Sequence, residues 1–315
     1  MVLSGKTYYT ARMAQTSLAG TSLRDLEYVE AVAELKHFSK AAARCNVSQP
    51  ALSEQIQKLE ARLGVMIFER GRRQVAVTPA GEKIVGQIGK VLSAARDLFA
   101  LGAESDTLSG GLQIGAIETL GPYYLPFLLR LLKDNVPRLE PHLSEGRTAA
   151  LTEKLRHGLL DLIITAEPEE PGLGAQPLFF EPFFLVAPLR HALAKAARVD
   201  LKHLPPGELL LLEEGHCLRD QALALCDAEP GVMRHSTSLE TLWQMVAAGE
   251  GISLLPALAL AARSDLRERI CSRALEDGTG RWLSLKWRAS DPRGARFKEL
   301  AAFLSLNAPE GLKGS

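Results

Sequence analysis

The chain has 315 residues, of which 37 are basic and 37 acidic, so its formal net charge at pH 7 is zero. Apolar residues make up 46% of the chain and charged residues 23%, a composition typical of globular proteins that excludes a disordered or fibrous chain. At roughly 100 to 200 residues per domain, this length predicts two or three compact units. Zero net charge does not exclude nucleic acid as a partner, because a basic patch can be local.

The chain has four cysteines, Cys45, Cys217, Cys226 and Cys271, which are too few and too widely spaced for a disulfide scaffold. No CxxC pair indicates zinc, so we expect neither a metal nor a cofactor. The first 21 residues contain no apolar run of signal-peptide length, and no later segment approaches the length of a membrane span. We therefore expect a loose tail at 1–21, a reducing cytoplasmic location and no membrane partner.

The next segment predicts two helices in succession. Ser22, followed three residues later by Asp25, is typical of a helix start, and the apolar spacing beyond it predicts a helix that ends near Lys36. Ser39 is the expected cap of a second, short helix over Lys40–Arg44. The polar turn that follows leads to a third helix, and two helices around a short turn predict a helix-turn-helix.

The third helix has an apolar and a polar side. Ser48 is its expected cap, with Pro50 in the first turn, where a missing N–H is harmless. The residues expected to face the core are Leu52, Ile56, Leu59 and Leu63. The short polar groups on the other side could be a solvated face or could reach base edges in a major groove. The candidate DNA-contacting residues of this helix are Ser48, Gln49, Pro50, Ser53 and Gln57.

A basic hairpin favours the DNA-binding interpretation. The segment 67–78 predicts two short strands around a turn that carries Arg70, Arg72 and Arg73, and such a wing neutralises phosphates. The run from Phe38 to Gly81, FSKAAARCNVSQPALSEQIQKLEARLGVMIFERGRRQVAVTPAG, resembles the LysR-type DNA-binding domain along nearly its whole length. The resemblance implies a winged helix-turn-helix domain at 22–80, with promoter DNA and RNA polymerase as partners.

A long helix is expected after the wing, with Thr78 as its cap and Pro79 in its first turn. Apolar residues then follow at alternating steps of four and three: Ile84, Ile88, Val91, Ala95 and Leu98. This spacing indicates a coiled-coil seam between two subunits, although a helix packed against the chain's own core would give the same pattern. We expect a linker helix and hinge at 81–110, a homodimer, and a homotetramer as the higher assembly.

The remaining chain, 111–308, predicts an α/β domain, with a short tail at 309–315. Short apolar runs such as 112–116, 160–164, 209–212 and 252–254 alternate with helical patterns, which favours a mostly parallel sheet. Longer runs at 178–187 and 282–288 look like strands that cross between two lobes. This half resembles the LysR-type effector domain, which implies two periplasmic-binding-protein-like lobes with a cleft between them.

One segment indicates redox chemistry. The sequence LEEGHCLRDQALALC, from Leu212 to Cys226, resembles the redox segment of the OxyR subfamily, and the segment from Glu118 to Tyr123 resembles the same subfamily. Cys217 lies beside His216 and near Arg219 at an expected helix start, which favours its thiolate. A thiolate of this kind is oxidised by peroxide to sulfenic acid, which a second thiol can capture.

The resemblance assigns roles to these residues. It implies that Cys217 is peroxidatic and Cys226 resolving, and that Thr119 and His216 position hydrogen peroxide. Arg219 and Asp220 also match the motif. Cys45 and Cys271 are expected to be small buried residues without a redox role. A protein thiol reductant such as glutaredoxin or thioredoxin would reset the sensor.

Two other functions stay open at this point. A thiol peroxidase would use the same pair of cysteines, but the helix-turn-helix argues for a regulator that is not an enzyme. A LysR-type regulator that responds to a metabolite would carry the cysteines only incidentally.

The spacing of the two cysteines makes a physical prediction. If the nine-residue step from Cys217 to Cys226 is helical, the two Cα atoms lie on the order of 13 Å apart. A disulfide tolerates at most about 7 Å. We therefore expect oxidation to unwind or bend the segment between them.

Overall fold

A computed structural model describes residues 20–70, 75–102, 108–166, 170–195, 201, 204, 207–226, 235–263, 265, 268–275 and 279–314. The chain divides into two compact units, one up to Ile88 and one from Gly89 onward, and each is described by itself. The predicted tail at 1–21 lies outside the described residues except for Gly20 and Thr21. None of the described helices is long and apolar enough to cross a membrane.

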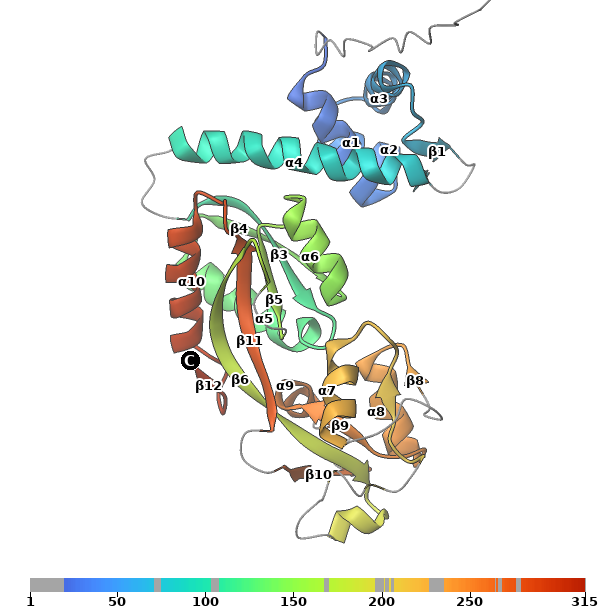
Figure 1. Cartoon of the computed structure of the whole chain (residues 1–315), viewed down its shortest axis with the longest axis vertical. Helices are drawn as coiled ribbons and strands as arrows, with labels where there is room; N and C mark the ends of the chain where they lie inside the picture. The colour runs from blue at the N-terminus through green and yellow to red at the C-terminus, as the bar shows by residue number, and fades with distance from the viewer. Residues whose placement is uncertain are drawn as a thin grey trace, which may run out of the picture. The chain divides into compact units, whose positions relative to one another are not determined.

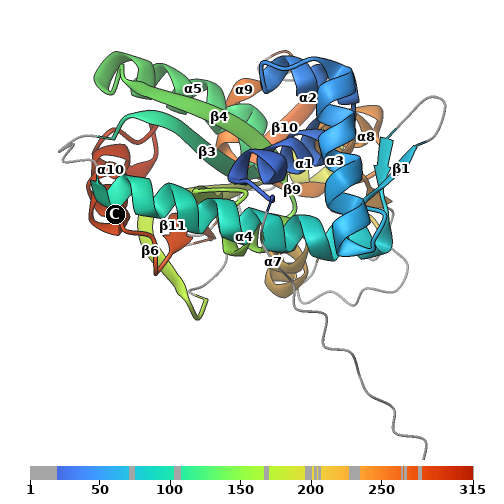
Figure 2. The ribbon, with the colours of Figure 1, turned by 90° about the horizontal axis from the view of Figure 1, so that it is seen from above.

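The N-terminal unit is the predicted winged helix-turn-helix. Its elements are α1 (Leu23–Leu35), α2 (Phe38–Arg44), α3 (Gln49–Leu63) and the antiparallel pair β1 (Phe68–Arg70) and β2 (Val75–Val77). Figure 2 shows the three helices gathered together, with β1 beside α3. Both the helix-turn-helix and the two-stranded wing are therefore confirmed.

Local hydrogen bonds set most of these helix boundaries as expected. Ser22 and Asp25 form a reciprocal capping box at the start of α1, and the Ser48 hydroxyl accepts the Ala51 N–H at the start of α3. The predicted cap at Ser39 is wrong. His37 has the extended backbone that a cap requires, and its Nδ1 accepts the Lys40 N–H, so α2 begins one residue before Ser39.

The apolar side of α3 forms the core of this unit, with one exception. Leu52, Ile56 and Leu59 are buried, whereas Leu63 is 40% exposed. Leu63 is the last residue of α3, and the chain turns away at Gly64, which adopts a left-handed conformation with φ of 66°. Glu60 is buried on the same helix because its carboxylate accepts the Ile67 and Phe68 N–H groups where the wing begins.

The second unit begins within α4 (Pro79–Gly102) and continues as a two-lobed α/β domain. In the first lobe, β3 (Gly110–Ile117) lies parallel to β4 (Leu139–Gly146) and β5 (Leu162–Thr165). The helices α5 (Gly121–Asn135) and α6 (Thr148–Arg156) connect these strands, and α10 (Gly294–Leu306) also packs against the sheet (Figure 1).

Two long strands run from one lobe into the other, as the sequence predicts. The first is β6 (Leu173–Pro188), which pairs with the antiparallel β11 (Gly280–Arg288) as far as Pro182. From Phe183 onward β6 pairs with β9 (Ser253–Pro256) and β10 (Ile270–Ala274) of the second lobe. The expectation of a mostly parallel sheet is wrong, because these two crossing strands run in opposite directions and all of their partners pair antiparallel.

The second lobe is built around the far end of β6. Its remaining described elements are η1 (Ala192–Lys195), β7 (Leu211–Leu212), α7 (Cys217–Cys226), β8 (His235–Ser236), α8 (Leu239–Ala248) and α9 (Ala257–Ala262), and β12 (Lys313–Gly314) adds to β6 in the first lobe. The far end of β6 contributes to two apolar clusters: Phe183 and Val186 enter the one around Trp243, and Leu185 and Ala187 the one that holds Cys226.

Candidate functional site

The helix α7 begins and ends at the two cysteines of the motif. Cys217 is buried against the core of the first lobe, whereas Cys226 is buried in the second lobe, in the apolar cluster that also holds Leu185 and Ala187 of β6. The segment is therefore helical as assumed, and ten helical residues place the two Cα atoms about 13 Å apart. Neither cysteine is in a disulfide. A bond between them requires α7 to change shape.

A cavity of about 430 Å³ lies at the Cys217 end of α7, where the two lobes meet. Thr148, the first residue of α6, lines this cavity together with Cys217, Gly215 and Asp220. Two helix N-termini therefore border one cavity, an arrangement that favours anions. The Thr148 hydroxyl is buried without a hydrogen-bond partner among the described residues. Sequence reasoning missed Thr148, because nothing in its neighbours distinguishes it from an ordinary helix start.

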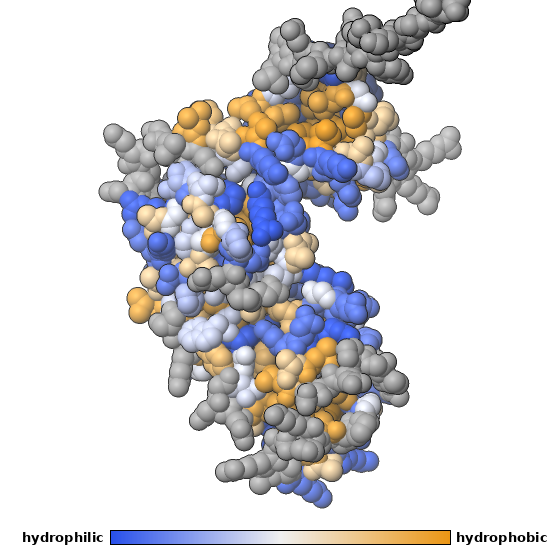
Figure 3. Space-filling model, viewed as in Figure 1, coloured by the Kyte–Doolittle hydropathy of each residue, from blue (hydrophilic) through white to orange (hydrophobic). Residues whose placement is uncertain are grey.

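His216 is almost completely buried directly before Cys217. Its Nδ1 lies 3.6 Å from a carboxylate oxygen of Glu118, and its Nε2 is buried without a partner among the described residues. Burial lowers the pKa of His216, whereas the nearby Glu118 carboxylate acts in the opposite direction. Figure 3 shows hydrophilic side chains gathered on one face where the two lobes meet.

Thr119 is buried on the first-lobe side and is held by a buried ion pair. Arg281 donates to the Thr119 hydroxyl at 2.8 Å and to the Thr119 carbonyl at 3.1 Å. The same guanidinium pairs with Glu181 at 2.8 Å, and both charged side chains are fully buried. Because Arg281 and Glu181 face each other in the ladder, the pair fixes the point where β6 and β11 cross between lobes. A charged residue in each of two apolar strands was the signal that sequence reasoning missed.

The remaining two motif residues lie on different sides of α7. The guanidinium of Arg219 is buried and donates to the Leu212 carbonyl at 3.0 Å, and it lies 2.9 Å from the ring of His235. Arg219 therefore links α7 to β7 through Leu212 and to β8 through His235. Asp220 is exposed and lines the Cys217 cavity.

The environment of Cys226 suppresses its ionisation. Burial in an apolar cluster raises the pKa of its thiol to about 11, so this thiol stays protonated at neutral pH. A protonated thiol is a poor partner for peroxide, because the thiolate is the nucleophile. The two ends of α7 thus differ in chemistry as well as in position.

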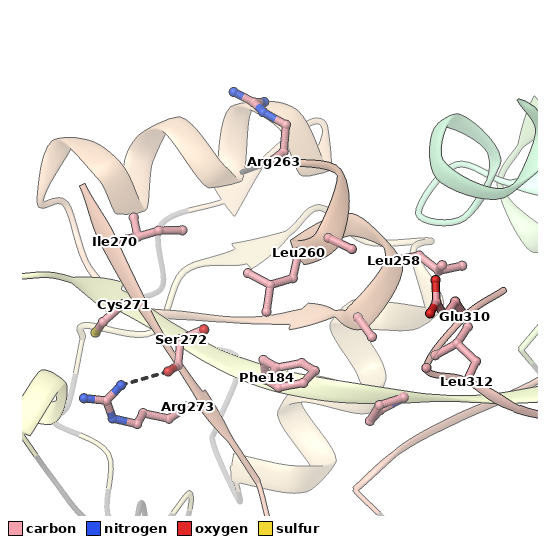
Figure 4. A pocket seen from close by; sticks show the side chains of 14 residues that line it. Phe184, Leu258, Leu260, Arg263, Ile270, Cys271, Ser272, Arg273, Glu310 and Leu312 are labelled. Carbon is pink, nitrogen blue, oxygen red and sulfur yellow. Dashed lines mark hydrogen bonds between the residues drawn. The ribbon is translucent and has the colours of Figure 1, made fainter. Parts of the chain in front are cut away.

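The other two cysteines lie away from this helix. Cys45 is half-buried at the end of α2, and burial raises the pKa of its thiol. Cys271 on β10 is half-buried with its Sγ 3.4 Å from the Ala187 carbonyl, and it lines a different cavity, of about 560 Å³. Figure 4 shows Phe184 and Leu260 between Cys271 and Glu310 in that cavity. None of the predicted peroxide-site residues lines it.

The predicted DNA-contacting residues of α3 are accessible. Ser48, Gln49, Pro50 and Gln57 are exposed and Ser53 is half-buried, so one side of the helix remains open beside the buried stripe. Of the predicted phosphate contacts, Arg72 and Arg73 lie outside the described residues. Arg70 ends β1, but its side chain is likewise outside the described part.

The predicted seam on α4 is partly exposed in the single chain. Val91 is 41% and Leu98 67% exposed, while Ile88 is buried and Ile84 and Ala95 are half-buried. The two exposed seam residues are seven positions apart and therefore lie on the same side of the helix. The neighbouring Phe99 is also largely exposed.

Comparison with known proteins identifies the family. Residues 23–82 match the bacterial regulatory helix-turn-helix model of the lysR family, and residues 105–307 match the LysR substrate binding domain. The chain therefore belongs to the LysR family of DNA-binding transcriptional regulators.

Within that family the chain belongs to the OxyR subfamily. It is 41% identical over 285 residues to the transcriptional dual regulator OxyR of Escherichia coli, covering 89% of this chain and 93% of that protein. It is 42% identical to a probable hydrogen peroxide-inducible genes activator of Streptomyces viridosporus, covering 90% and 93%. Its structure is similar to that of a full-length OxyR variant from Pseudomonas aeruginosa, with a TM-score of 0.73, 40% identity and coverage of 90% and 95%.

Another similar structure is a hydrogen peroxide-bound OxyR mutant from Corynebacterium glutamicum, with a TM-score of 0.60 and 37% identity, covering 90% of this chain and 91% of that one.

No cluster of His, Cys, Asp and Glu within the described part of this chain could hold a metal ion.

Proposed function

We propose that this protein is a transcriptional regulator that senses hydrogen peroxide through Cys217 and Cys226. The observation that carries the proposal is the helix α7, which begins at a cysteine beside a cavity and ends at a cysteine buried in an apolar cluster. The names of the relatives, which include hydrogen peroxide-inducible activators, support the same substrate.

The chemistry proceeds in two steps. The Cys217 thiolate attacks one oxygen of the peroxide and the O–O bond breaks, so that Cys217 becomes a sulfenic acid and the leaving hydroxide takes a proton to form water. The Cys226 sulfur then attacks the sulfenic sulfur, its thiol proton leaves with the hydroxyl as a second water, and a disulfide forms. A dithiol reductant of the glutaredoxin or thioredoxin class returns the two electrons.

The second step drives the conformational change. The two Cα atoms must approach from about 13 Å to within about 7 Å, so α7 unwinds or bends. Cys226 then leaves its apolar cluster, and Leu218 leaves the cluster around Trp243. Closing so short a loop contributes about 3 kcal/mol in the chain-entropy model, comparable with the loss of one or two buried leucines. The gain from closing the loop and the cost of rearranging α7 are therefore of similar size.

Hydrogen exchange with mass mapping tests the switch. Stoichiometric peroxide should produce a Cys217–Cys226 disulfide and faster exchange from Gly215 to Cys226, and Cys217→Ser should abolish both changes. A disulfide without any change in exchange or in operator footprint would refute the refolding of α7. A metabolite that shifts DNA binding with both cysteines replaced would favour the metabolite-responsive alternative. Catalytic turnover of excess peroxide, faster than the change in DNA binding, would favour a thiol peroxidase.

The proposed regulator binds promoter DNA as a symmetric oligomer through α3 and the wing. The exposed seam residues Val91 and Leu98 support pairing of two α4 helices, and two-fold symmetry requires half-sites separated by about 34 to 36 Å or a multiple of that distance. Val91→Asp combined with Ile88→Asp should weaken both the oligomer and operator binding, as measured by sedimentation and footprinting. If both properties survive, the seam is wrongly assigned.

The readout of bases and of phosphates can be separated by salt dependence. Replacing Arg70, Arg72 or Arg73 by Ala should weaken specific and non-specific DNA alike and flatten the slope of log affinity against log salt by about one unit. Gln49→Ala should change which bases are preferred, with the salt slope kept. An unchanged preference would remove Gln49 from the readout.

A further inference from the structure

We propose that Glu118 is a positioning residue for peroxide reduction: its carboxylate orients the buried imidazole of His216 across the cleft, so that ring atom Nε2 is left for the reacting groups. This inference rests on the proposed peroxide function, and it gives a role in that function to Glu118 in addition to the two cysteines.

The contact joins the two lobes. Glu118 follows directly after β3 in the first lobe, and its backbone N–H donates to the Gly146 carbonyl at 3.3 Å, which ties it to the end of β4. His216 belongs to the second lobe and precedes α7. The distance of 3.6 Å between the Glu118 carboxylate and Nδ1 of His216 is that of an ion pair when the ring is protonated.

The state of the second ring nitrogen indicates what this contact does. Nε2 of His216 is buried and has no hydrogen-bond partner among the described residues. A buried polar atom without a partner is costly, and it marks a place that a small polar molecule can satisfy. A carboxylate beside Nδ1 favours the proton on Nδ1, which leaves a lone pair on Nε2 of the neutral ring. Glu118 therefore selects the tautomer in which Nε2 can accept a proton.

The other charged groups near the ring do not replace Glu118. Arg147 donates to the Glu214 carbonyl at 3.0 Å and lies 3.4 Å from a carboxylate oxygen of Glu213, so its charge and that of Glu213 offset each other. Glu145 lies close enough to Glu118 that burial and the Glu118 charge together raise the pKa of Glu145. Glu118 is the carboxylate within 4 Å of His216 among the described residues.

The proton transfers balance with this tautomer. Nε2 accepts the proton of the Cys217 thiol, which gives the thiolate and an imidazolium that the Glu118 carboxylate stabilises. After the thiolate attacks peroxide, the same proton passes from Nε2 to the leaving hydroxide and forms water. The net reaction converts a thiol and hydrogen peroxide into a sulfenic acid and water, with the ring neutral at the start and at the end.

Three substitutions in the full-length protein test the role. Glu118→Gln keeps the shape but removes the charge, and Glu118→Asp restores the carboxylate. Glu140→Gln is the control, because it removes an exposed carboxylate of β4 that does not line the Cys217 cavity. The measurement is the second-order rate of Cys217 oxidation by hydrogen peroxide across a pH series. Nuclear magnetic resonance of the His216 ring nitrogens gives a second readout that needs no peroxide.

We expect Glu118→Gln to slow oxidation at neutral pH by about tenfold or more, consistent with loss of an oriented base. Because the carboxylate raises the pKa of His216, its removal should move the acidic limb of the pH profile to lower pH. The ring should also lose its Nδ1–H tautomer, Glu118→Asp should recover most of the rate, and Glu140→Gln should behave as wild type.

An unchanged tautomer and an unchanged pH profile in Glu118→Gln would overturn the proposal, and so would an equal effect of Glu140→Gln. Loss of rate with an unchanged tautomer and pH limb would reduce Glu118 to a structural role and would also overturn it. If wild-type Cys217 itself fails to react with peroxide, the proposed function fails, whereas the His216 tautomer still reports on Glu118.

Discussion

The two ends of α7 differ in what surrounds them. Cys217 packs against the core of the first lobe but also borders a cavity, together with polar side chains and two helix N-termini. The Cys226 end lies in an apolar cluster with Leu209, Ile252 and Leu254. The comparison shows how one short helix can place two thiols in different surroundings. Reactivity depends on the surroundings of each sulfur rather than on the cysteine itself.

The largest expected effect comes from the buried ion pair between Arg281 and Glu181, which holds Thr119. Arg281→Met leaves Glu181 buried without its counter-charge, which should lower the free energy of unfolding by about 3 to 5 kcal/mol. Urea unfolding of the reduced protein measures the loss. Adding Glu181→Gln to this variant removes the unpaired charge but keeps an acceptor for the Leu258 N–H, so most of the loss should be recovered. A double variant as unstable as the single one would contradict this account.

The raised pKa of Cys226 predicts how its alkylation depends on pH. Because burial raises the pKa of the Cys226 thiol to about 11, its thiolate at pH 8 is roughly 100-fold rarer than that of a thiol with the ordinary value. Alkylation of Cys226 by iodoacetamide should be slow at pH 8 and rise about tenfold for each unit up to pH 10. Mass mapping follows each cysteine, with the urea-unfolded chain as control. Equal rates of alkylation of Cys226 and Cys217 in the folded protein would contradict the difference between the two ends of α7.

A smaller effect is expected at Thr119. Thr119→Val removes the hydroxyl that accepts from Arg281 but keeps the shape and the backbone acceptor, so it should cost about 1 to 2 kcal/mol of folding stability. Thr165→Val is a matched control, because that hydroxyl is fully buried without a partner among the described residues. Thr165→Val should be neutral or stabilising. Equal losses in the two variants would show that the Arg281 contact contributes nothing.

The smallest effect is expected at the cysteines outside α7. Cys45→Ser and Cys271→Ser should each leave the rate of peroxide-induced disulfide formation within about twofold of wild type, because neither sulfur borders the Cys217 cavity. Thiol mapping after stoichiometric peroxide measures that rate. A slower reaction in either variant would mean that a third sulfur takes part.

The sequence by itself determined the local features of this protein. The capping box at Ser22, the cap at Ser48, the wing and the helix start near Cys217 were all predicted, because their hydrogen bonds and apolar spacing involve residues only a few positions apart. The motif around Cys217 likewise indicated the subfamily. The misassigned cap at Ser39 and the exposed Leu63 show that local patterns leave helix ends uncertain by a residue or two.

Only the tertiary structure decided the long-range contacts of the residues in the two motifs. Arg281 reaches Thr119 from 162 positions away, Glu118 meets His216 from the opposite lobe, and Arg219 turns toward Leu212 and His235. No local spacing encodes these contacts, because they depend on where β6 and β11 cross and on how the lobes pack. The charges of Arg281 and Glu181 are tolerated in the interior because the crossing strands bring them face to face.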